Sequence, residues 1–536
     1  MKIKSIIALL LIALLSVTTD SCKIKNPIDG AKLIINFDLL KTYVNLQFTD
    51  AKTGNLIGFN GDVEVAVAVM GENSDAVVDN SGVIRESYSS ANGFLALALN
   101  PNTEFVPSVS NPIKFTVVAT LDGYISTSKS ISILAEGTYN EKIVMTDISN
   151  PPDGVVVKEE KGVGNLIDGN VQEDISVKTQ GDEVGISIPA GTIIKDGNGN
   201  TLSGSLDITL VYFDNLKDES LASFPGGLMT TIYQDGQSQD GAFFSAGFLA
   251  LEISDENGTS AKTFEQNTLG LSMGIQGATY NPETQSSIAA GDDLPVYSYD
   301  PDNGQWTYEQ TVSVESGGRS DFNVTAQLSH LSYWNFDWFW SEYCDEGIQF
   351  LFTGDFGGCG CTTQFGIMRK QADNTFFSYI DLYGCENDPI QTYYAPANMP
   401  VYIEWINSGC FNTIVDEDFT YIENLCAPDI VELNLITLGA NTTTVTIDVM
   451  GRCASNPDVE IRPTYGGWFR PVDEYCWRWE FMTNGIAQIC DVEIGKEYVI
   501  GTYFNGQWYE MNYVVEQDMI VEWNIELPDD FCSQIF

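Results

Sequence analysis

Alternation of apolar and polar residues at every second position is the feature that most limits what this chain can fold into. VEVAVAV at residues 63–69 and TTTVTIDV at residues 442–449 are two examples. A period of two is typical of strands, because successive side chains point to opposite faces of a sheet. Turn dipeptides that accept a positive φ, such as Asn198-Gly199, separate the runs. Helical periodicity is scarce, so we predict an all-β protein.

The first residues have the pattern of an export signal. Lys2 and Lys4 precede an apolar run at residues 6–15, which is too short to span a bilayer and has the length of a signal-peptide core. We therefore interpret residues 1–21 as a signal peptide and expect the chain to be exported.

Ser21-Cys22 resembles the lipobox of bacterial lipoproteins, in which the cysteine is acylated and becomes the first residue. The resemblance implies a lipid anchor on Cys22, a tether over residues 22–31, and a place on the outer membrane, at the cell surface rather than on its periplasmic face. A soluble secreted protein is the alternative.

The charge balance excludes one class of partner. The chain has 74 acidic and 25 basic residues, which give a formal net charge of −49. Such a chain repels the phosphates of nucleic acids and anionic lipid head groups. We expect no nucleic-acid partner, and contact with a membrane only through the lipid anchor.

Apart from Cys22, all cysteines lie in roughly the last third of the chain: Cys344, Cys359, Cys361, Cys385, Cys410, Cys426, Cys453, Cys476, Cys490 and Cys532. An even number of cysteines in an exported chain predicts up to five disulfides. Zinc is the alternative, but Cys359 and Cys361 lack the usual two-residue gap and no histidine follows them. We predict no metal site there.

The first folded unit is expected at residues 32–148. Its segment FTDAKTGNLIGFNGDVEVAVAV at residues 48–69 resembles the opening of carboxypeptidase-regulatory-like or other prealbumin-type β-sandwiches. Residues 149–162 contain Pro151-Pro152 and mixed charges, so we interpret them as a linker.

Residues 163–343 form the second predicted unit. It contains IPAGT at residues 188–192, FSAGFLALEISDENG at residues 244–258 and YDPDNGQW at residues 299–306. In this order the segments resemble the ZU5 and UPA-type β-domains of receptor, scaffold and bacterial surface proteins. The resemblance implies a further β region.

The remainder is predicted to be two related β-sandwiches stapled by disulfides, at residues 344–438 and 439–536. IVELNL at residues 430–435 recurs as IVEWNI at residues 520–525. The fold class that results is a set of tandem β-sandwiches, Ig-like or prealbumin-like, with a disulfide-rich C-terminal part.

The cysteines of these two units also recur at a similar offset. Cys361 and Cys385 are echoed by Cys453 and Cys476. Equivalent turns of duplicated sandwiches would explain the echo.

His330-Leu331-Ser332 holds the only histidine of the chain. A base beside a serine hydroxyl permits attack on the preceding carbonyl and cleavage between Leu331 and Ser332. The tripeptide resembles the self-cleaving sequence of some ZU5-containing proteins. The alternative is that His330 simply lies at the end of a strand with its ring nitrogen satisfied by backbone.

The run YWNFDWFW at residues 333–340 places four aromatic rings on one face if it is extended: Trp334, Phe336, Trp338 and Trp340. Exposed rings would form a platform for a sugar ligand. The same rings could fill a core or a junction between units, which is favourable by about 1.5 to 3 kcal/mol for each large apolar side chain. We favour the core.

Asp196, Asn198 and Asn200 space their oxygens like the first half of a calcium loop. Thr201 stands where such a loop needs glycine, so a hairpin turn explains the segment better. We expect no cofactor, with calcium at these three residues as the alternative.

These features favour an exported, lipid-anchored envelope protein whose modules stand in series and hold binding loops away from the membrane. Binding, adhesion or assembly with a protein or glycan partner, in the envelope or on a neighbouring surface, is the expected role, and an enzyme is not expected. The alternatives are a self-processing protein cleaved after Leu331 and a glycan-binding or glycan-degrading accessory protein.

Overall fold

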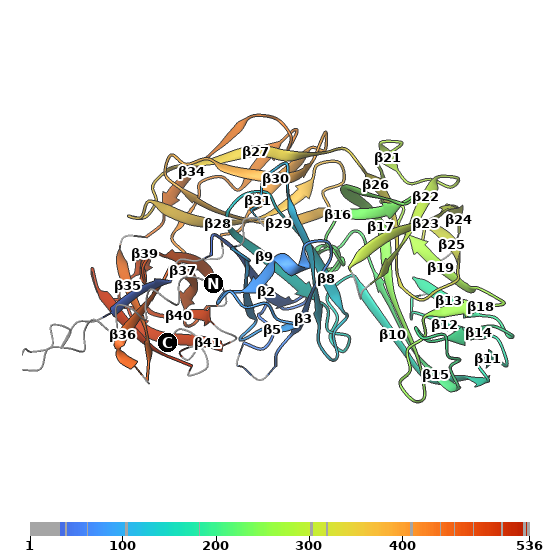
Figure 1. Ribbon diagram of the computed structural model, residues 1–536. Coiled ribbons are helices and arrows are strands. Elements are labelled where there is room, and N and C mark those ends of the chain that lie inside the picture. The colour runs from blue at the N-terminus through green and yellow to red at the C-terminus, as the bar shows by residue number, and fades with distance from the viewer. Residues whose placement is uncertain are drawn as a thin grey trace, which may run out of the picture.

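A computed structural model of the chain describes residues 33–37, 40–59, 61, 63–101, 106–181, 183–300, 304–317, 320–407, 411–439, 441–454, 456–474, 476–504, 507–528 and 532. Nearly all regular structure in these residues is strand (Figure 1), apart from the 3-10 turn η1 (Ser74–Ala76) and the short helix α2 (Asp218–Ala222). The predicted all-β class with β-sandwich modules is confirmed.

The first unit is a sandwich of two four-stranded sheets. Its strands are β2 (Thr42–Asp50), β3 (Ala66–Met70), β4 (Val77–Asp79), β5 (Tyr88–Ser89), β6 (Phe94–Leu99), β7 (Ile113–Thr120), β8 (Thr127–Ile133) and β9 (Gly137–Met145). One sheet has the order β4-β6-β2-β9 and the other β5-β3-β7-β8.

The last two units are also sandwiches. The third contains β27 (Tyr343–Gly354), β28 (Cys361–Lys370), β29 (Phe376–Cys385), β30 (Ile390–Pro396), β31 (Val401–Trp405), β32 (Thr413–Val415), β33 (Phe419–Ile422) and β34 (Ile430–Thr437). The fourth contains β35 (Thr442–Cys453), β36 (Asn456–Pro463), β37 (Tyr465–Pro471), β38 (Arg478–Met482), β39 (Ile486–Glu493), β40 (Glu497–Phe504), β41 (Gln507–Val514) and β42 (Ile520–Leu527).

These three sandwiches repeat one strand order. In each, a first strand lies between an antiparallel neighbour and the last strand, which runs parallel to it: β6-β2-β9, β30-β27-β34 and β39-β35-β42. The opposite sheets match as well, as β5-β3-β7-β8, β29-β28-β31-β33 and β38-β37-β40-β41. The common order is consistent with the prealbumin-type resemblance of the first unit, and it extends that topology to the last two.

The repeated IVE segments begin equivalent strands, because β34 and β42 are each the last strand of their sandwich. The recurring cysteine spacing has no such structural basis, and its interpretation as equivalent turns of two sandwiches is wrong. Cys361 and Cys385 lie on neighbouring strands and bond to each other, whereas Cys453 ends the first strand of its unit and bonds to Cys532.

The second unit is built differently, from one large sheet, a smaller one and a short two-stranded sheet. Its strands are β10 (Val155–Ile167), β11 (Asn170–Val171), β12 (Ile175–Lys178), β13 (Val184–Ile188), β14 (Ile193–Lys195), β15 (Gly204–Phe213), β16 (Met229–Gln234), β17 (Gln237–Asp255), β18 (Thr263–Glu265), β19 (Leu269–Ile275), β20 (Tyr280–Asn281), β21 (Ser286–Ser287), β22 (Asp293–Asp300), β23 (Gln305–Ser313), β24 (Glu315–Ser316), β25 (Phe322–Leu328) and β26 (Tyr333–Trp340).

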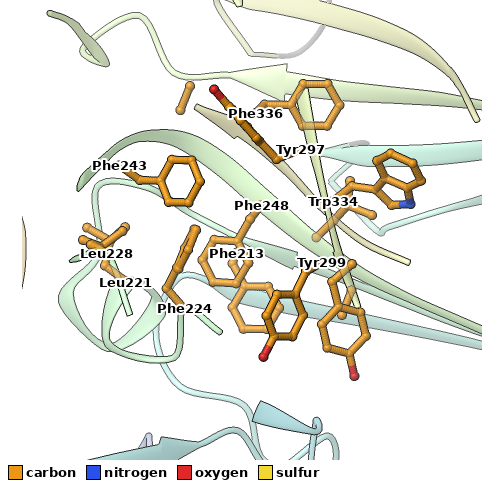
Figure 2. Close-up of a cluster of buried hydrophobic side chains, with 14 of the residues drawn as sticks. Phe213, Leu221, Phe224, Leu228, Phe243, Phe248, Tyr297, Tyr299, Trp334 and Phe336 are labelled. Atoms are coloured by element: carbon orange, nitrogen blue, oxygen red, sulfur yellow. The ribbon is translucent and has the colours of Figure 1, made fainter. Parts of the chain in front are cut away.

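The large sheet has the order β16-β23-β22-β26-β17-β15-β10-β11-β14-β18, and the smaller one β12-β13-β19-β25-β24. Because β16 also pairs with β17, the strands β16, β23, β22, β26 and β17 close into a ring. Aromatic side chains fill the space beside these strands, among them Phe224, Phe243 and Tyr297 (Figure 2). The ZU5/UPA-like character of this unit stays a resemblance.

The segment that we interpreted as a linker is partly strand. β10 begins at Val155, and its pairing with β15 already covers Lys158, Glu159 and Glu160. The two prolines that suggested a linker lie before this strand, where no ladder hydrogen bond is required of them. The second unit therefore starts inside residues 149–162.

The first and fourth sandwiches pack face to face. All six residues of β6 (FLALAL) are buried, because its alternate side chains face the unit's own core and the neighbouring sandwich. The ring of Phe94 lies 4.4 Å from that of Trp468 and 5.0 Å from that of Trp508. At Gly501 of the fourth sandwich, an added Cβ would overlap the Trp508 ring.

Hydrogen bonds and one further strand strengthen this junction. The Tyr43 hydroxyl donates to the Thr464 carbonyl at 2.8 Å, and the Tyr503 hydroxyl donates to the Ser89 carbonyl at 3.2 Å. The strand β1 (Leu33–Phe37) pairs in parallel with β36 of the fourth unit. The expectation of modules standing in series is therefore wrong, because the first unit packs against the fourth and not only against its neighbour in sequence (Figure 1).

The other units are tied together by charge and by a disulfide. Arg369 of the third unit donates to both carboxylate oxygens of Asp218 on α2, at 2.9 and 2.6 Å. The ammonium nitrogen of Lys114 in the first unit lies 2.8 Å from a carboxylate oxygen of Asp240 in the second. Cys359 and Cys490 join the third and fourth units.

The disulfide-rich C-terminal part is confirmed. Four bonds join described residues: Cys344–Cys426, Cys359–Cys490, Cys361–Cys385 and Cys453–Cys532. Cys476 is disulfide-bonded as well. The predicted signal peptide, the tether with Cys22, and Cys410 lie outside the described residues.

The inter-unit disulfide should stabilise the fold more than a local one. The loop entropy of an unfolded chain predicts a loss of about 5 kcal/mol when the Cys359–Cys490 bond, with a separation of 131 residues, is replaced by serines. The same model predicts about 3.5 kcal/mol for Cys361–Cys385, with a separation of 24 residues. Denaturant unfolding of the two double variants measures the difference, and equal losses would contradict the expectation.

Candidate functional site

An open groove of about 660 Å³ lies on the second unit, at the residues that the sequence singled out. His330, Leu331 and Ser332 form one wall, and the turn that starts at Asp196 forms another. Strands β22 and β23 add Ser298 and Glu309 among others. Lys262, Thr263 and Glu265 line it as well, so the groove joins four segments of the second unit, and its lining is mainly polar and charged.

His330 is held at the rim of this groove. Its backbone bridges to Thr263, and its ring packs 4.9 Å from the ring of Trp334. The ring nitrogen Nε2 lies 3.7 Å from a carboxylate oxygen of Glu309, which also accepts a hydrogen bond of 2.7 Å from the Ser298 hydroxyl. The imidazole thus faces a carboxylate and the open groove.

Ser332 has a different environment although it is only two residues away. Its side chain is buried, and its hydroxyl donates to the Tyr299 carbonyl at 2.5 Å. The amide of Leu331 donates to the Lys262 carbonyl at 2.8 Å, which fixes the backbone between the two side chains. The hydroxyl proton is thus directed to a backbone carbonyl, and the imidazole to Glu309. Cleavage after Leu331 stays a prediction.

The aromatic run forms β26, a central strand between β17 and β22. Trp334, Phe336 and Trp338 share one face as predicted, and they are 1%, 0% and 2% exposed. Trp340 is partly buried, and its indole nitrogen donates to the Ala397 carbonyl of the third unit at 2.9 Å. The ligand platform is therefore wrong, because three of the four rings are buried in the core and Trp340 packs at the junction with the third unit, as the alternative predicts.

The opposite face of β26 carries a buried polar pair. Asn335 and Asp337 are both 0% exposed, and a bulge in β17 turns the amide of Ala246 toward Asp337, which accepts its hydrogen bond at 3.0 Å. Burial raises the pKa of Asp337 to about 8. The ammonium of Lys370 lies nearby, 4.5 Å from the centre of the Phe244 ring.

Asp196, Asn198 and Asn200 form a hairpin turn after β14. One carboxylate oxygen of Asp196 accepts the amides of Asn198 and Asn200 at 2.9 and 2.8 Å, and the other accepts the Asn200 side chain at 3.0 Å. These hydrogen bonds lower the pKa of Asp196. Asp255 binds the amides of Asn257 and Thr259 in the same manner, so the turn explanation suffices for the spacing.

Within the described part of the chain, no group of three or more His, Cys, Asp or Glu side chains is arranged to hold a metal ion. No helix in that part has the length and hydrophobicity of a membrane span.

Sequence reasoning missed the carboxylate and the hydroxyl that complete the groove, Glu309 and Ser298. No local signal marks them, because strand pairing alone brings them to His330. It also missed the burial of Asn335 and Asp337. No local signal marks this burial either, because polar residues that alternate with aromatic ones are typical of a strand with one exposed face.

Comparisons with known proteins do not assign a family. No protein family and no curated protein matches the chain. The shaft pilin SpaA from Lactobacillus rhamnosus GG aligns over 35% of this chain and 100% of its own, at 7% identity and a TM-score of 0.15. A minor pilin from Streptococcus agalactiae covers 35% and 97%, at 10% identity and a TM-score of 0.13.

BcpA, the major pilin subunit of Bacillus cereus, aligns over 90% of this chain and 98% of its own, at 8% identity and a TM-score of 0.13. TM-scores this low do not identify a shared fold. The assignment as a set of β-sandwiches therefore rests on the strand pairings of the chain itself.

The buried carboxyl of Asp337 should make stability depend on pH. Its pKa is about 8 in the folded protein and near 3.8 when exposed. The neutral carboxyl therefore makes its full contribution to the free energy of unfolding below pH 4, and this contribution is lost as the pH rises toward 8. Asp337→Asn stays neutral and should lose less free energy of unfolding between pH 5 and pH 8 than the unaltered protein. Denaturant unfolding at both values measures this.

The exposed Asp429→Asn serves as the control and should leave the pH dependence unchanged. A part of the dependence should survive in Asp337→Asn, because burial also raises the pKa of Asp381 to about 8 and of Glu480 to about 7. Identical pH profiles for Asp337→Asn and the unaltered protein would contradict the assignment.

Proposed function

We propose that this protein is an exported, lipid-anchored component of a bacterial cell envelope that binds or assembles with a partner and performs no catalysis. Its partner, a protein or a glycan of the envelope or of a neighbouring surface, is held in the groove at His330. The chain lies at the cell surface, attached through acylated Cys22.

One observation carries the proposal: the four units lock together through aromatic, charged and disulfide contacts into a body that leaves a polar groove open. A groove lined by carboxylates, hydroxyls and lysines suits a partner that forms many hydrogen bonds. The disulfides support export, since such bonds persist in oxidising compartments.

Catalysis at this groove lacks support from the geometry. A serine nucleophile needs a base within hydrogen-bond reach that takes up its proton. The proton of Ser332 is donated to the Tyr299 carbonyl instead, and the carboxylate of Glu309 faces His330. A role in binding uses the same groups without that requirement.

Photo-crosslinking in the producing cell tests the groove. A photoreactive phenylalanine analogue at Thr263, an exposed residue of the groove, should give one discrete adduct with an envelope component. The adduct should weaken at least fivefold with Glu309→Ala, because the groove loses a charged group. The same analogue at exposed Ser286, outside the groove, is the control. No adduct, or equal adducts at both positions, would refute binding at the groove.

Labelling with palmitate tests the anchor and the integrity of the chain together. We expect one labelled band of the intact mature chain on a denaturing gel, and loss of the label with Cys22→Ala. An unlabelled protein would refute the anchor. Two fragments that divide near residue 331 and merge into one band with Ser332→Ala would establish self-cleavage instead.

A further inference from the structure

A second cavity, of about 220 Å³, lies where the first, third and fourth units meet. Strands β2 and β9 supply Thr49 and Lys142, β29 supplies Tyr379 and Asp381, and the fourth unit supplies Trp477. The groove at His330 shares no residue with it. This cavity exists only because three units pack together.

Lys142 brings an unpaired positive charge to the cavity. No carboxylate of the described residues forms an ion pair with its ammonium group, which instead lies 4.3 Å from the centre of the Tyr379 ring. Burial lowers the pKa of Lys142 to about 8. An ammonium group in this position gains from any anion that reaches it, because a partly desolvated charge interacts more strongly.

Asp381 brings an unpaired carboxyl group to the same cavity. Its oxygen Oδ1 is shielded from solvent and has no hydrogen-bond partner. Burial and the nearby charge of Glu141 raise its pKa to about 8. Glu141 also lines the cavity, where it forms an ion pair of 2.8 Å with Lys129. Asp381 is therefore the carboxyl group at this end that lacks a partner, and a cation that reached it would favour its ionised form.

Thr49 adds a buried polar atom that has no hydrogen-bond partner. The residue is 4% exposed, and its hydroxyl has no hydrogen-bond partner although buried hydroxyls are normally paired. Phe365, Tyr379 and Trp477 give the cavity an aromatic wall, and Gln47, Asn140 and Lys129 are further polar residues of its lining. Lys142 and Asp381 line one small cavity without forming an ion pair with each other, so each is left to a ligand.

We propose that this cavity binds a small zwitterion of the size of a single amino acid. The carboxylate of the ligand pairs with Lys142, its ammonium group pairs with Asp381 beside Glu141, and its side chain packs against the aromatic wall. A volume of about 220 Å³ lies below the range of about 300 to 1,000 Å³ typical of sites for larger organic ligands. The polar groups that burial leaves unpaired are those that a zwitterion satisfies.

Calorimetric titration of the full mature chain with each of the twenty free amino acids tests the proposal. At least one should bind. The matching carboxylic acid without the amine, and the matching amine without the carboxylate, should bind at least tenfold more weakly. Lys142→Met and Asp381→Asn should each weaken the binding amino acid at least tenfold.

Lys158→Met is the matched control, because Lys158 pairs with Glu160 on β10 and does not line the cavity. It should leave the affinity unchanged. Thr49→Val provides a further variant, expected to weaken binding severalfold, in case a charge variant does not fold; thermal unfolding of each variant identifies such a failure. Absence of binding by all twenty amino acids overturns the proposal, as does binding that Asp381→Asn and Thr49→Val leave unchanged.

Discussion

The packing of the first sandwich against the fourth is the contact on which the rest of the structure depends. Phe94, Trp468, Trp477 and Trp508 form its centre, with ring centroids 4.4 to 6.0 Å apart. Rings of this size on the outer face of a sheet would otherwise form a large exposed apolar patch. Their burial holds the first and fourth units together, although these units lie far apart in the sequence.

The two candidate sites arise in different ways. The groove at His330 depends on pairing within the second unit, which joins the turn at Asp196 to β22 and β23. The cavity at Lys142 depends on three units meeting. In the cavity, packing buries an ammonium and a carboxyl group that are not paired with each other, which is a costly arrangement for a protein without a ligand. Buried polar groups without partners are therefore the observation that points to this cavity as a binding site.

Local patterns predicted the strands because apolar alternation and turn chemistry act over a few residues. The alternation of Trp334, Phe336 and Trp338 was predicted correctly, and so was the relation between the last two sandwiches from their IVE segments. The exposure of those rings as a ligand platform was not, because exposure depends on whether β17 and β22 flank the strand. The interpretation of residues 149–162 as a linker failed for the same reason, because β10 forms only by pairing with β15, which lies further along the chain.

The sequence by itself determined the all-β class, the repeated sandwich units and the disulfide-rich C-terminal part, because period-two burial, tight turns and cysteine content are properties of short segments and of composition. Only the tertiary structure decided which faces are covered, which cysteines bond, and which charged groups meet at a cavity. These outcomes depend on contacts between residues hundreds of positions apart, such as Tyr43 with Thr464. Their free energies come from burial between units, which no local pattern specifies.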